Sequence, residues 1–504
     1  MRRIYKPFVG LTKTLPGGPY WTTQLGKRSP ARNPEGTMTT TLSFGARTFG
    51  SVDLGDQRRT ARLAQLADAL CRHPGGTLPD KLSRPADLRA FYQLMNRRPV
   101  THARLLHAHA DETRQRLAAL DSGVALILHD ATELDYTTKA TLLPHLGQIG
   151  QGTRRGYICH NSLAVRADTG ETLGLVSQIL HHRADVPKNE TLAQSRQRLD
   201  RESRLWVHGA QASGPAPADV RCIDVSDSLS DTFEYMAYEH TQQREFVLRS
   251  RENRGLQTPI AGQEYLWDAV RQLPSQGQRP LTVLASPGRT ARTTTVEVAF
   301  TAVTLALPSK AQGEYPKKPL AVWAVRVWEP NTPRGEDLLE WILLTNVPVT
   351  GVAEAYERID WYEKRPIIEE LHKAMKTGCR IEDMQFTTIQ RLEPAIAVLS
   401  AVATTLLRLR DAARAPDGAT RPATAVVTAE YVEVLTRHYP KRIKKAPSVH
   451  TFYLHVARLG GHQNRKADGF PGWITLWRGW MKLQCMVDGW RAAHLKTKVS
   501  SGKS

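Results

Sequence analysis

The segment Tyr362–Lys376, with the sequence YEKRPIIEELHKAMK, decides how the rest of the chain is interpreted. On a helix that turns 100° per residue, Arg365, Glu369 and Lys376 fall within about 60° of Tyr362. The apolar residues of the segment fall on the opposite side: Ile367, Ile368, Leu371, Ala374 and Met375. The periodicity alone indicates an amphipathic helix that packs one face into a core and exposes a charged face.

Pro366 interrupts this pattern near its start. Proline fits the first turn of a helix and disfavours helical geometry at the residue before it, which here is Arg365. Tyr362 is therefore expected either on the helix or on the turn that precedes it.

The spacing Tyr-x2-Arg-x3-Glu-x6-Lys, which Thr377 and Gly378 follow, resembles the YREK signature of bacterial insertion-sequence transposases. The stretch IEELHKAMKTG is similar to the same segment in transposon-five members of the insertion-sequence-four family. The resemblance implies an RNase H-like catalytic core with an Asp-Asp-Glu triad, in which Glu369 is the third carboxylate. It also implies DNA contacts by four residues of the segment: Tyr362, Arg365, Lys373 and Lys376.

The chain of 504 residues carries 69 Lys and Arg against 49 Asp and Glu, a formal net charge of +20. A surface this basic attracts polyanions, so nucleic acid is the first candidate partner and an anionic membrane surface the second. We find no basic amphipathic helix with bulky apolar anchors, and we expect no apolar run that approaches bilayer-spanning length. The expectation is a soluble globular protein that binds DNA and no membrane.

Five cysteines are far apart in the sequence: Cys71, Cys159, Cys222, Cys379 and Cys485. They show neither a disulfide framework nor zinc-ligand spacing, which is typical of a protein in a reducing cytoplasm. No Walker or Rossmann glycine pattern is present, so ATP or nicotinamide chemistry is not implied. The cysteine usage therefore indicates a cytoplasmic protein, and the resemblance to bacterial transposases implies a bacterial protein associated with the nucleoid.

Residues 1–43 are expected to be a disordered extension, because residues 1–37 are rich in Gly, Pro, Thr and basic residues without a sustained period. Translation from Met1 and translation from Met38 are both open.

A helical DNA-binding domain is expected over residues 44–105. The phrase LGDQRRTARL sets Arg58, Arg59 and Arg62 along an Ala/Leu-rich amphipathic segment, and Asp87–Asn96 adds a second helical segment. The arginines are either the solvated end of a helix or contacts to phosphates and bases. The phrase is similar to the opening of the family's proteins, where this region reads the transposon end, and the resemblance implies DNA binding by all three arginines.

Two strand ends supply the other candidate carboxylates. The apolar run Val124–Leu128 leads into Asp130, and the run beginning at Val220 leads into Asp227. Each carboxylate could be an ordinary turn residue, but the resemblance implies that both belong to the triad. Asp224 is the rival of Asp227, and strand alternation places it on the opposite face.

The sequence departs from the family pattern just after Asp227. The family has an Arg and a Glu there and a second Asp four residues on, whereas this chain has Ser228 and Leu229 and keeps Asp231. The carboxylate that would bind metal is thus retained, while its neighbours are changed.

Several further residues take their expected roles from the resemblance. Arg249 and Arg251 match basic family positions that contact DNA. Trp341 is either a buried strand residue or, as the resemblance implies, the aromatic that receives a base flipped out of the duplex. The aromatic that follows the YREK arginine in the family is replaced here by Pro366.

The expected fold is multidomain α/β. The helical N-terminal domain precedes an RNase H-like catalytic domain over 120–395, with a β-strand insertion at about 255–335, and a helical protein-interaction domain over 396–495 follows. Trp477, Trp480 and Trp490 in the last region are expected to be core or interface aromatics.

Three carboxylates at one point repel one another, so the triad requires divalent cations. Oxygen ligands suit Mg²⁺ or Mn²⁺, and two ions about 4 Å apart could activate the attacking oxygen and stabilise the leaving one. The resemblance implies cut-and-paste transposition by a homodimer in a synaptic complex with transposon ends and target DNA. The alternatives are a catalytically inactive relative that binds DNA as an inhibitor, which Ser228 and Leu229 favour, and a plain metal nuclease.

Overall fold

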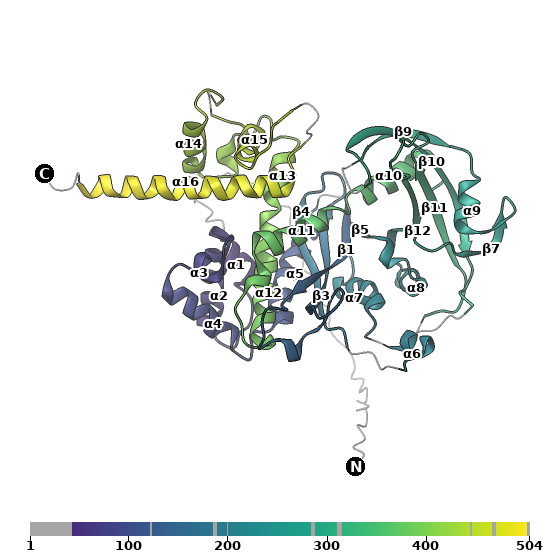
Figure 1. Cartoon of the computed structure of the whole chain (residues 1–504), viewed down its shortest axis with the longest axis horizontal. Helices are drawn as coiled ribbons and strands as arrows, with labels where there is room; N and C mark the ends of the chain where they lie inside the picture. Colours follow the sequence, from purple (N-terminus) through teal and green to yellow (C-terminus); the bar gives the residue numbers. More distant parts are fainter. Residues whose placement is uncertain are drawn as a thin grey trace, which may run out of the picture. The chain divides into compact units, whose positions relative to one another are not determined.

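One mixed sheet runs through the computed structural model, with helices on both of its faces (Figure 1). The structure describes residues 43–120, 123–184, 189–198, 200–283, 288–309, 315–443, 446–465 and 470–500. The extension expected over residues 1–43 lies outside this part of the chain except for Ser43. The description below therefore concerns the compact unit Ser43–Ser504.

Five helices form the N-terminal region: α1 (Phe44–Phe49), α2 (Gln57–Arg72), α3 (Leu78–Lys81), α4 (Pro85–Met95) and α5 (His102–Ala118). Helix α2 begins where the Asp56 carboxylate accepts a hydrogen bond from the Arg58 backbone N–H at 2.8 Å, an N-cap that stabilises the first turn. The helical stretch continues past residue 105, because α5 extends to Ala118 and packs on β4 and α12.

The central strands are β1 (Gly123–Asp135), β3 (Arg155–Arg166), β4 (Thr172–His181), β5 (Val220–Ser226) and β6 (Glu245–Arg249). They lie in the order β4-β3-β1-β5-β6, and the two-residue β2 (Gly147–Gln148) also pairs with β3. Strands β1, β3 and β4 pair antiparallel, whereas β5 and β6 run parallel to β1. The parallel pairs use helical crossovers: α6 (Leu192–Gln197) and α7 (Leu205–Ser213) precede β5, and α8 (Phe233–Thr241) precedes β6.

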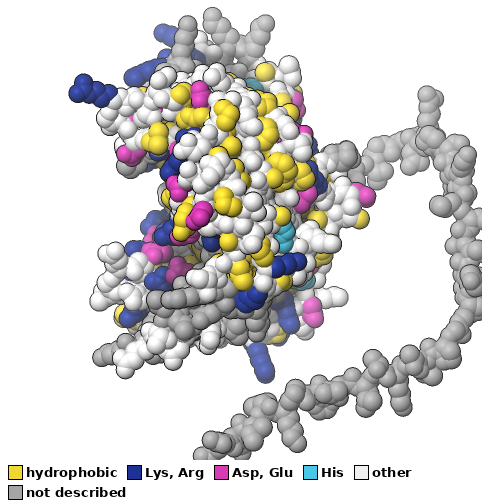
Figure 2. Space-filling view, turned by 90° about the vertical axis from the view of Figure 1, so that its right-hand side faces the viewer, with side chains coloured by type: hydrophobic (Ala, Val, Ile, Leu, Met, Phe, Trp, Pro, Cys, Tyr) yellow, Lys and Arg dark blue, Asp and Glu magenta, His cyan; other side chains and the backbone are white. Residues whose placement is uncertain are grey.

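The β-rich segment after β6 extends the same sheet. It comprises β7 (Gly255–Ile260), β8 (Gln263–Tyr265), α9 (Leu266–Arg271), β9 (Gly277–Val283), β10 (Arg292–Leu305) and β11 (Leu320–Trp328). Strand β12 (Glu340–Thr345) joins the two parts, since it pairs with β11 on one side and with β6 on the other. On the face that Figure 2 shows, apolar side chains are interspersed with charged ones, and basic side chains do not gather into one patch.

The segment Tyr362–Lys376 does not form one continuous helix. Helix α10 (Val352–Glu363) contains Tyr362, the chain turns at Lys364–Pro366, and α11 (Ile367–Lys373) follows with Pro366 at its N-cap. A wide turn with π-helical hydrogen bonds, Ala374–Gly378, then ends the segment. The break falls where proline disfavours helical geometry at the preceding residue. The apolar side chains of α11 and this turn are buried, as the periodicity predicted.

The C-terminal region is helical: α12 (Ile389–Leu406), α13 (Arg408–Arg414), α14 (Ala429–His438), α15 (Val449–Leu459) and α16 (Trp473–Ser500). Contrary to the expectation from sequence, the stretch Ile389–Arg414 is long and apolar enough to span a bilayer by length and composition. In the fold 83% of its most apolar window is buried, and α12 packs against α2, α4, α5 and β4. It is therefore a core helix.

The N-terminal helices are fixed to the rest of the unit by polar contacts as well as by packing. The Lys81 ammonium is buried and donates to the backbone carbonyl of Cys379 at 2.8 Å. The Arg391 guanidinium donates to the Asn96 side chain at 2.7 Å. Residues of α2 and α4 thus share one core with α12.

Candidate catalytic and DNA-binding site

The three carboxylates proposed from separate parts of the sequence meet at one guanidinium. Arg365 Nη2 lies 3.6 Å from Asp130 Oδ2 and 3.7 Å from Asp227 Oδ2. Arg365 Nη1 donates a short hydrogen bond to Glu369 Oε1, one helical turn further on. Asp227 follows the end of β5 as predicted, but Asp130 lies inside β1, which continues to Asp135, so the prediction of a strand end there was wrong. Both aspartates and Glu369 on α11 nevertheless line a single site.

The sheet register explains why the two aspartates are neighbours. Strands β1 and β5 run parallel, and His129 on β1 pairs with Ser226 on β5. Asp130 follows His129 and Asp227 follows Ser226, so the two aspartates lie side by side. The Asp130 carboxylate accepts a hydrogen bond from the Ala131 N–H at 2.9 Å. Asp227 caps a short 3-10 turn and accepts from the Leu229 N–H at 2.9 Å. Both carboxylates are held by backbone groups at defined positions.

The site carries more negative than positive charge. Burial raises the pKa of Asp130 to about 6, Arg365 opposes this shift, and the nearby Asp227 and Glu369 carboxylates add to it. A single guanidinium thus faces three carboxylates. Their oxygen donors are of the type that Mg²⁺ and Mn²⁺ prefer, and a divalent cation would complete the charge balance. Among the described residues, no three Asp, Glu, His or Cys side chains are grouped as a ready metal cage.

Asp224, the rival of Asp227, lies on the other face of β5. It is 1% exposed and bonds to His129 Nε2 at 2.7 Å and to the Arg244 guanidinium at 2.9 Å. Strand alternation predicted this placement. The carboxylate is fully engaged in a buried ion-pair network, and Arg244, which the sequence analysis did not single out, is its principal partner.

Tyr362 and Trp341 form the aromatic wall beside the carboxylates. Tyr362 is buried at the end of α10, and Trp341 is half-buried on β12. Their ring centroids lie 5.4 Å apart with the planes at 64°. Arg249, at the end of β6, donates to the Glu340 carbonyl at 3.3 Å. Burial raises the pKa of Tyr362, and the charges of Arg365 and Arg249 oppose this shift. Trp341 is therefore neither fully exposed nor fully part of the core.

The two lysines of the signature are placed differently from each other. Lys373 is exposed at the last position of α11. Lys376 lies on the π-helical turn, where its ammonium donates to the Glu133 carbonyl at 2.9 Å and lies 3.3 Å from the Glu382 carboxylate. The wide turn changes the angular spacing of a regular helix, so Lys376 does not follow the regular face on which the sequence analysis placed it.

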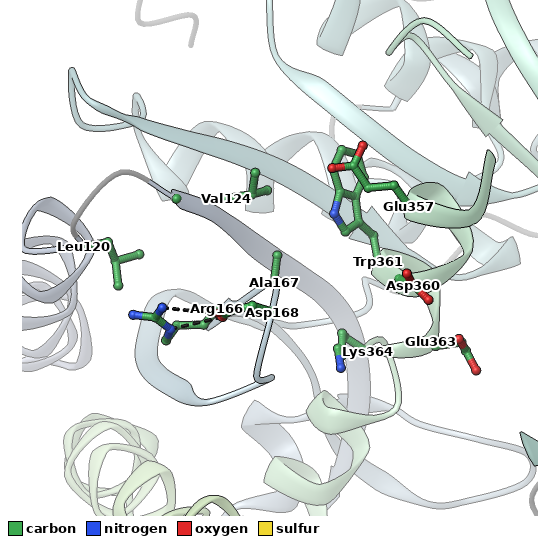
Figure 3. A pocket seen from close by; sticks show the side chains of 11 residues that line it. Leu120, Val124, Arg166, Ala167, Asp168, Glu357, Asp360, Trp361, Glu363 and Lys364 are labelled. Atoms are coloured by element: carbon green, nitrogen blue, oxygen red, sulfur yellow. Dashed lines mark hydrogen bonds and ion pairs between the residues drawn. The ribbon is translucent and has the colours of Figure 1, made fainter. Parts of the chain in front are cut away.

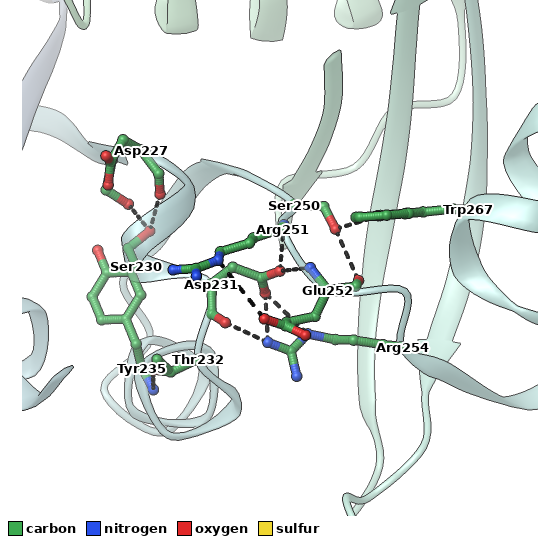
Figure 4. Close-up of polar contacts among 11 residues, drawn as sticks. Asp227, Ser230, Asp231, Thr232, Tyr235, Ser250, Arg251, Glu252, Arg254 and Trp267 are labelled. Carbon is green, nitrogen blue, oxygen red and sulfur yellow. Dashed lines mark hydrogen bonds and ion pairs between the residues drawn. The ribbon is translucent and has the colours of Figure 1, made fainter. Parts of the chain in front are cut away.

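Asp231 connects the Asp227 turn to the loop that carries Arg251 (Figure 4). Its carboxylate is buried and accepts the backbone N–H groups of Arg251 at 2.7 Å and Glu252 at 2.9 Å. It also forms an ion pair with Arg254 at 2.7 Å. The Arg251 side chain remains 59% exposed. The sequence signalled Asp231 as a retained family position, and Arg254, in the charged run RENR, was not recognised as its partner.

The three arginines of the N-terminal region have different surroundings. Arg58 is exposed, and no ion-pair or hydrogen-bond partner of its side chain occurs among the described residues. Arg59 donates to the Leu54 carbonyl at 3.1 Å. Arg62 forms an ion pair with Asp87 on α4 at 2.7 Å. Arg58 is thus free of polar side-chain contacts within the described residues, Arg59 keeps further N–H donors beside its one hydrogen bond, and Arg62 would have to leave Asp87 to bind a phosphate.

The comparison with known proteins identifies this same region. Residues 42–100 match the family model described as transposase DNA-binding, a match that covers α1 to α4 and includes Arg58, Arg59 and Arg62. The chain therefore carries a transposase DNA-binding domain. DNA is its partner, in agreement with its net charge of +20.

Proposed function

We propose that the chain is a DDE transposase of the insertion-sequence-four family, of the YREK type and similar to transposon-five members. In this proposal the N-terminal helices bind transposon ends, and the site around Arg365 carries out metal-dependent nicking, hairpin formation and strand transfer. The observation that carries the proposal is the convergence of Asp130, Asp227 and Glu369 on Arg365. Three carboxylates around one guanidinium repel one another, and metal-dependent chemistry would explain why they are grouped.

The strand order supports the same interpretation. An RNase H-like core has five strands in the order third, second, first, fourth and fifth, with the first three antiparallel and the last two parallel to the first. The order β4-β3-β1-β5-β6 and its strand directions fit that description. In such a core the acids lie on the first and fourth strands and on a following helix, which are the elements that carry Asp130, Asp227 and Glu369 here.

Asp130, Asp227 and Glu369 would hold the divalent cations, Mg²⁺ or Mn²⁺, which supply Lewis-acid activation of the attacking oxygen and stabilisation of the leaving oxygen. Arg365 balances part of the negative charge and orients the three carboxylates through direct contacts. Arg249 and Arg251 would contact the DNA backbone at the end of β6, and Lys373 would do so on α11. Trp341 would stack on a displaced base next to Tyr362.

The proposed assembly is a homodimer in a synaptic complex, in which two copies bring two transposon ends together. Its test is the stoichiometry of the complex on end DNA. Two protein copies and two duplexes would support the proposal, and a stable complex of one copy on one duplex that cleaves at full rate would contradict it.

A second candidate function is an inactive relative that binds ends without cutting them. It is favoured by the turn after Asp227, where Ser228 and Leu229 replace the charged family residues and Leu229 is 49% exposed. In that case the end-binding domain would compete with active copies for DNA.

The active transposase and the inactive relative can be distinguished with three variants: Asp130→Asn, Asp227→Asn and Glu369→Gln. Each amide keeps the side-chain shape and removes a metal-ligand charge, so each change should abolish nicking and leave end binding nearly intact. Gel shift and nicking are measured on one end fragment, with Mg²⁺ and with Mn²⁺. Nicking by wild type that all three changes abolish supports the transposase, and binding without nicking by wild type supports the inactive relative.

Asp224→Asn is the control for the choice of the second aspartate, because its carboxylate lies in the buried network on the opposite face. It should lower stability without a selective effect on nicking. Loss of nicking in a stably folded Asp224→Asn variant, together with retained nicking in Asp227→Asn, would move the site to the other face of β5.

A further inference from the structure

A basic cleft lies beside the candidate active site and is not used by the chemistry proposed above. It has a volume of about 880 Å³ and lies between the β3–β4 turn, the α10–α11 turn and α13, with Tyr453 of α15 on one wall. Seven basic and four acidic side chains line it. Lys364, which is the neighbour of Arg365 in the sequence, belongs to its wall.

Part of the basic lining is already neutralised. Arg410 is buried and bonds to Asp411, to Glu370, to Thr172 and to the Gly170 carbonyl. It serves to join α13 to the β3–β4 turn and has no capacity left for a ligand.

Arg116 and Arg166 are also neutralised, by Glu112 and Asp168, whereas the other four cations of the lining are poorly compensated. Among the described residues, the side chains of Arg408 and Lys364 have no ion-pair partner. Arg414 lies 4.0 Å from Glu370, a carboxylate that Arg410 already engages at 3.2 Å. Arg421 is held only loosely, 3.5 Å from the exposed Asp417. Partial desolvation lowers the pKa of both Arg408 and Arg414, although each residue keeps exposed surface. Bound anions would stabilise all four charges.

The neighbouring pocket shows that this preference for anions is local. It has a volume of about 680 Å³ and shares Arg166 and Lys364 with the cleft, but its other charged lining residues are acidic: Asp168, Glu357, Asp360 and Glu363. Figure 3 shows Lys364 between these acids and the turn that carries Asp168. Arg166 forms an ion pair with Asp168 at 2.9 Å. Lys364 therefore marks the border between an acidic and a basic surface next to the catalytic turn.

We propose that this cleft binds the backbone phosphates of duplex DNA, independently of base sequence, through Lys364, Arg408, Arg414 and Arg421. The proposal rests on DNA as the partner and on the α10–α11 turn, which contributes Lys364 to the cleft and Arg365 to the candidate active site. It adds a second DNA contact to that of the end-binding helices. The cations come from three separate segments and line one continuous cleft, which suits several phosphates of a polyanion better than one small anion. Arginine forks also match phosphate geometry.

The test is the salt dependence of binding to a short random-sequence duplex without divalent ions. The double variant Arg408→Gln/Arg414→Gln should bind more weakly. Its log–log salt slope should be shallower by about 0.9 for each phosphate that is no longer neutralised, hence by about 1.8. Arg408→Lys/Arg414→Lys keeps both charges and should keep most of the slope. Arg437→Gln is the matched control, because Arg437 is 69% exposed on α14 and pairs with Glu433 outside the cleft.

An unchanged slope in the glutamine double variant, with an unchanged unfolding midpoint, would overturn the proposal. Inorganic phosphate provides the second arm. If phosphate at constant ionic strength raises the unfolding midpoint of wild type but not of the double variant, while both keep the same DNA slope, the cleft binds small phosphates and not DNA. Neither measurement involves cleavage, so a failure of the proposed catalytic function would leave both results interpretable.

Discussion

Asp130 and Arg365 lie 3.6 Å apart, on the first strand of the sheet and on the turn between two helices that are more than two hundred residues further along the chain. The contact joins the two halves of the candidate active site. Because Arg365 also reaches Asp227 and Glu369, it is the cation that pairs with all three carboxylates in the part of the chain that the structure describes.

Arg365→Ala should therefore destabilise the metal-free protein, by about 1–3 kcal/mol, since hydrogen bonds to charged groups contribute on that order. Three carboxylates would then repel one another without a nearby guanidinium. Addition of Mg²⁺ should raise the unfolding midpoint more in this variant than in wild type. Urea unfolding with EDTA and with Mg²⁺ measures both effects, and Arg365→Lys, which keeps the charge, should lie in between. A Mg²⁺ effect that is the same in all three proteins would contradict the role of Arg365 as a countercharge.

Asp130→Asn should stabilise the metal-free protein at neutral pH. The pKa of Asp130 is raised to about 6 from an ordinary value of 3.8, so the folded state binds the proton more tightly than the unfolded chain. Wild type should therefore lose stability as the pH rises from about 4 to about 6, and the penalty should persist above that range. The variant lacks this penalty, and the difference should reach at most about 3 kcal/mol at pH 7. Urea unfolding at pH 4 and pH 7.5 checks it, and a difference that does not depend on pH would show that Asp130 does not titrate as described.

Arg58→Ala should weaken binding to end DNA and make the salt slope shallower by about 0.9, which is the contribution of one phosphate contact. Arg62→Ala should lower both DNA affinity and the stability of the helical domain, since its guanidinium pairs with Asp87 and helps to fix α2 on α4. Fluorescence anisotropy at several salt concentrations separates the two, with Asp87→Asn as the control for removal of the ion pair. Equal slopes for wild type and Arg58→Ala would place end recognition elsewhere.

Trp341→Ala should permit the first nick and suppress the hairpin product, because stacking on a base contributes about 1–3 kcal/mol. The edge contact with Tyr362 leaves part of the indole exposed, so truncation should not unfold the protein. Denaturing gels resolve nicked from hairpin products. Tyr362→Phe keeps the ring contact and serves as the control. Equal loss of nicking and hairpin formation, or loss of soluble protein, would favour a packing role.

Asp231→Asn should loosen the turn after β6. The carboxylate accepts two backbone N–H groups and pairs with Arg254, and an amide would weaken all three contacts. We expect faster hydrogen exchange at Arg251 and Glu252 and weaker DNA binding, with end discrimination unchanged. If hydrogen exchange became faster only in α8, Asp231 would support that helix and not the loop.

The sequence predicted those parts of the site that depend on local pattern. The apolar face of α11 follows from simple periodicity, and the apolar runs before Asp130 and Asp227 indicated two strands, although β1 continues past Asp130 to Asp135. The choice of these two aspartates as site residues came from the family resemblance. The break at Lys364–Pro366 was indicated by proline, but its effect, with Tyr362 on a separate helix, depends on how α10 packs. The pairing of Arg62 with Asp87 and of Lys376 with Glu133 depends on tertiary contacts, which no periodicity encodes.

The apolar helix α12 is a second example in which the sequence indicates the residue type but not its surroundings. Composition alone makes Ile389–Arg414 a candidate membrane span, and only its burial inside the fold identifies it as core. Trp477 and Trp480 were expected to be core or interface aromatics. Trp477 is buried and stacks on Trp473, and Trp480 stacks on Tyr431 at 5.0 Å. In α12 and in α16 the residue types predicted buried apolar side chains, whereas the residues that they pack against are known only from the fold.

The pairing of β12 with β6 has a consequence for synthesis on the ribosome. The partner of the β6 edge, Glu340–Thr345, is made roughly ninety residues after Arg249. At about 5–20 residues per second, the nascent chain carries that edge unpaired for about 5–20 s. An open strand edge is a template for pairing with another chain. Slow translation between β6 and β12 should therefore lower the yield of soluble protein more than an equal delay placed after β12.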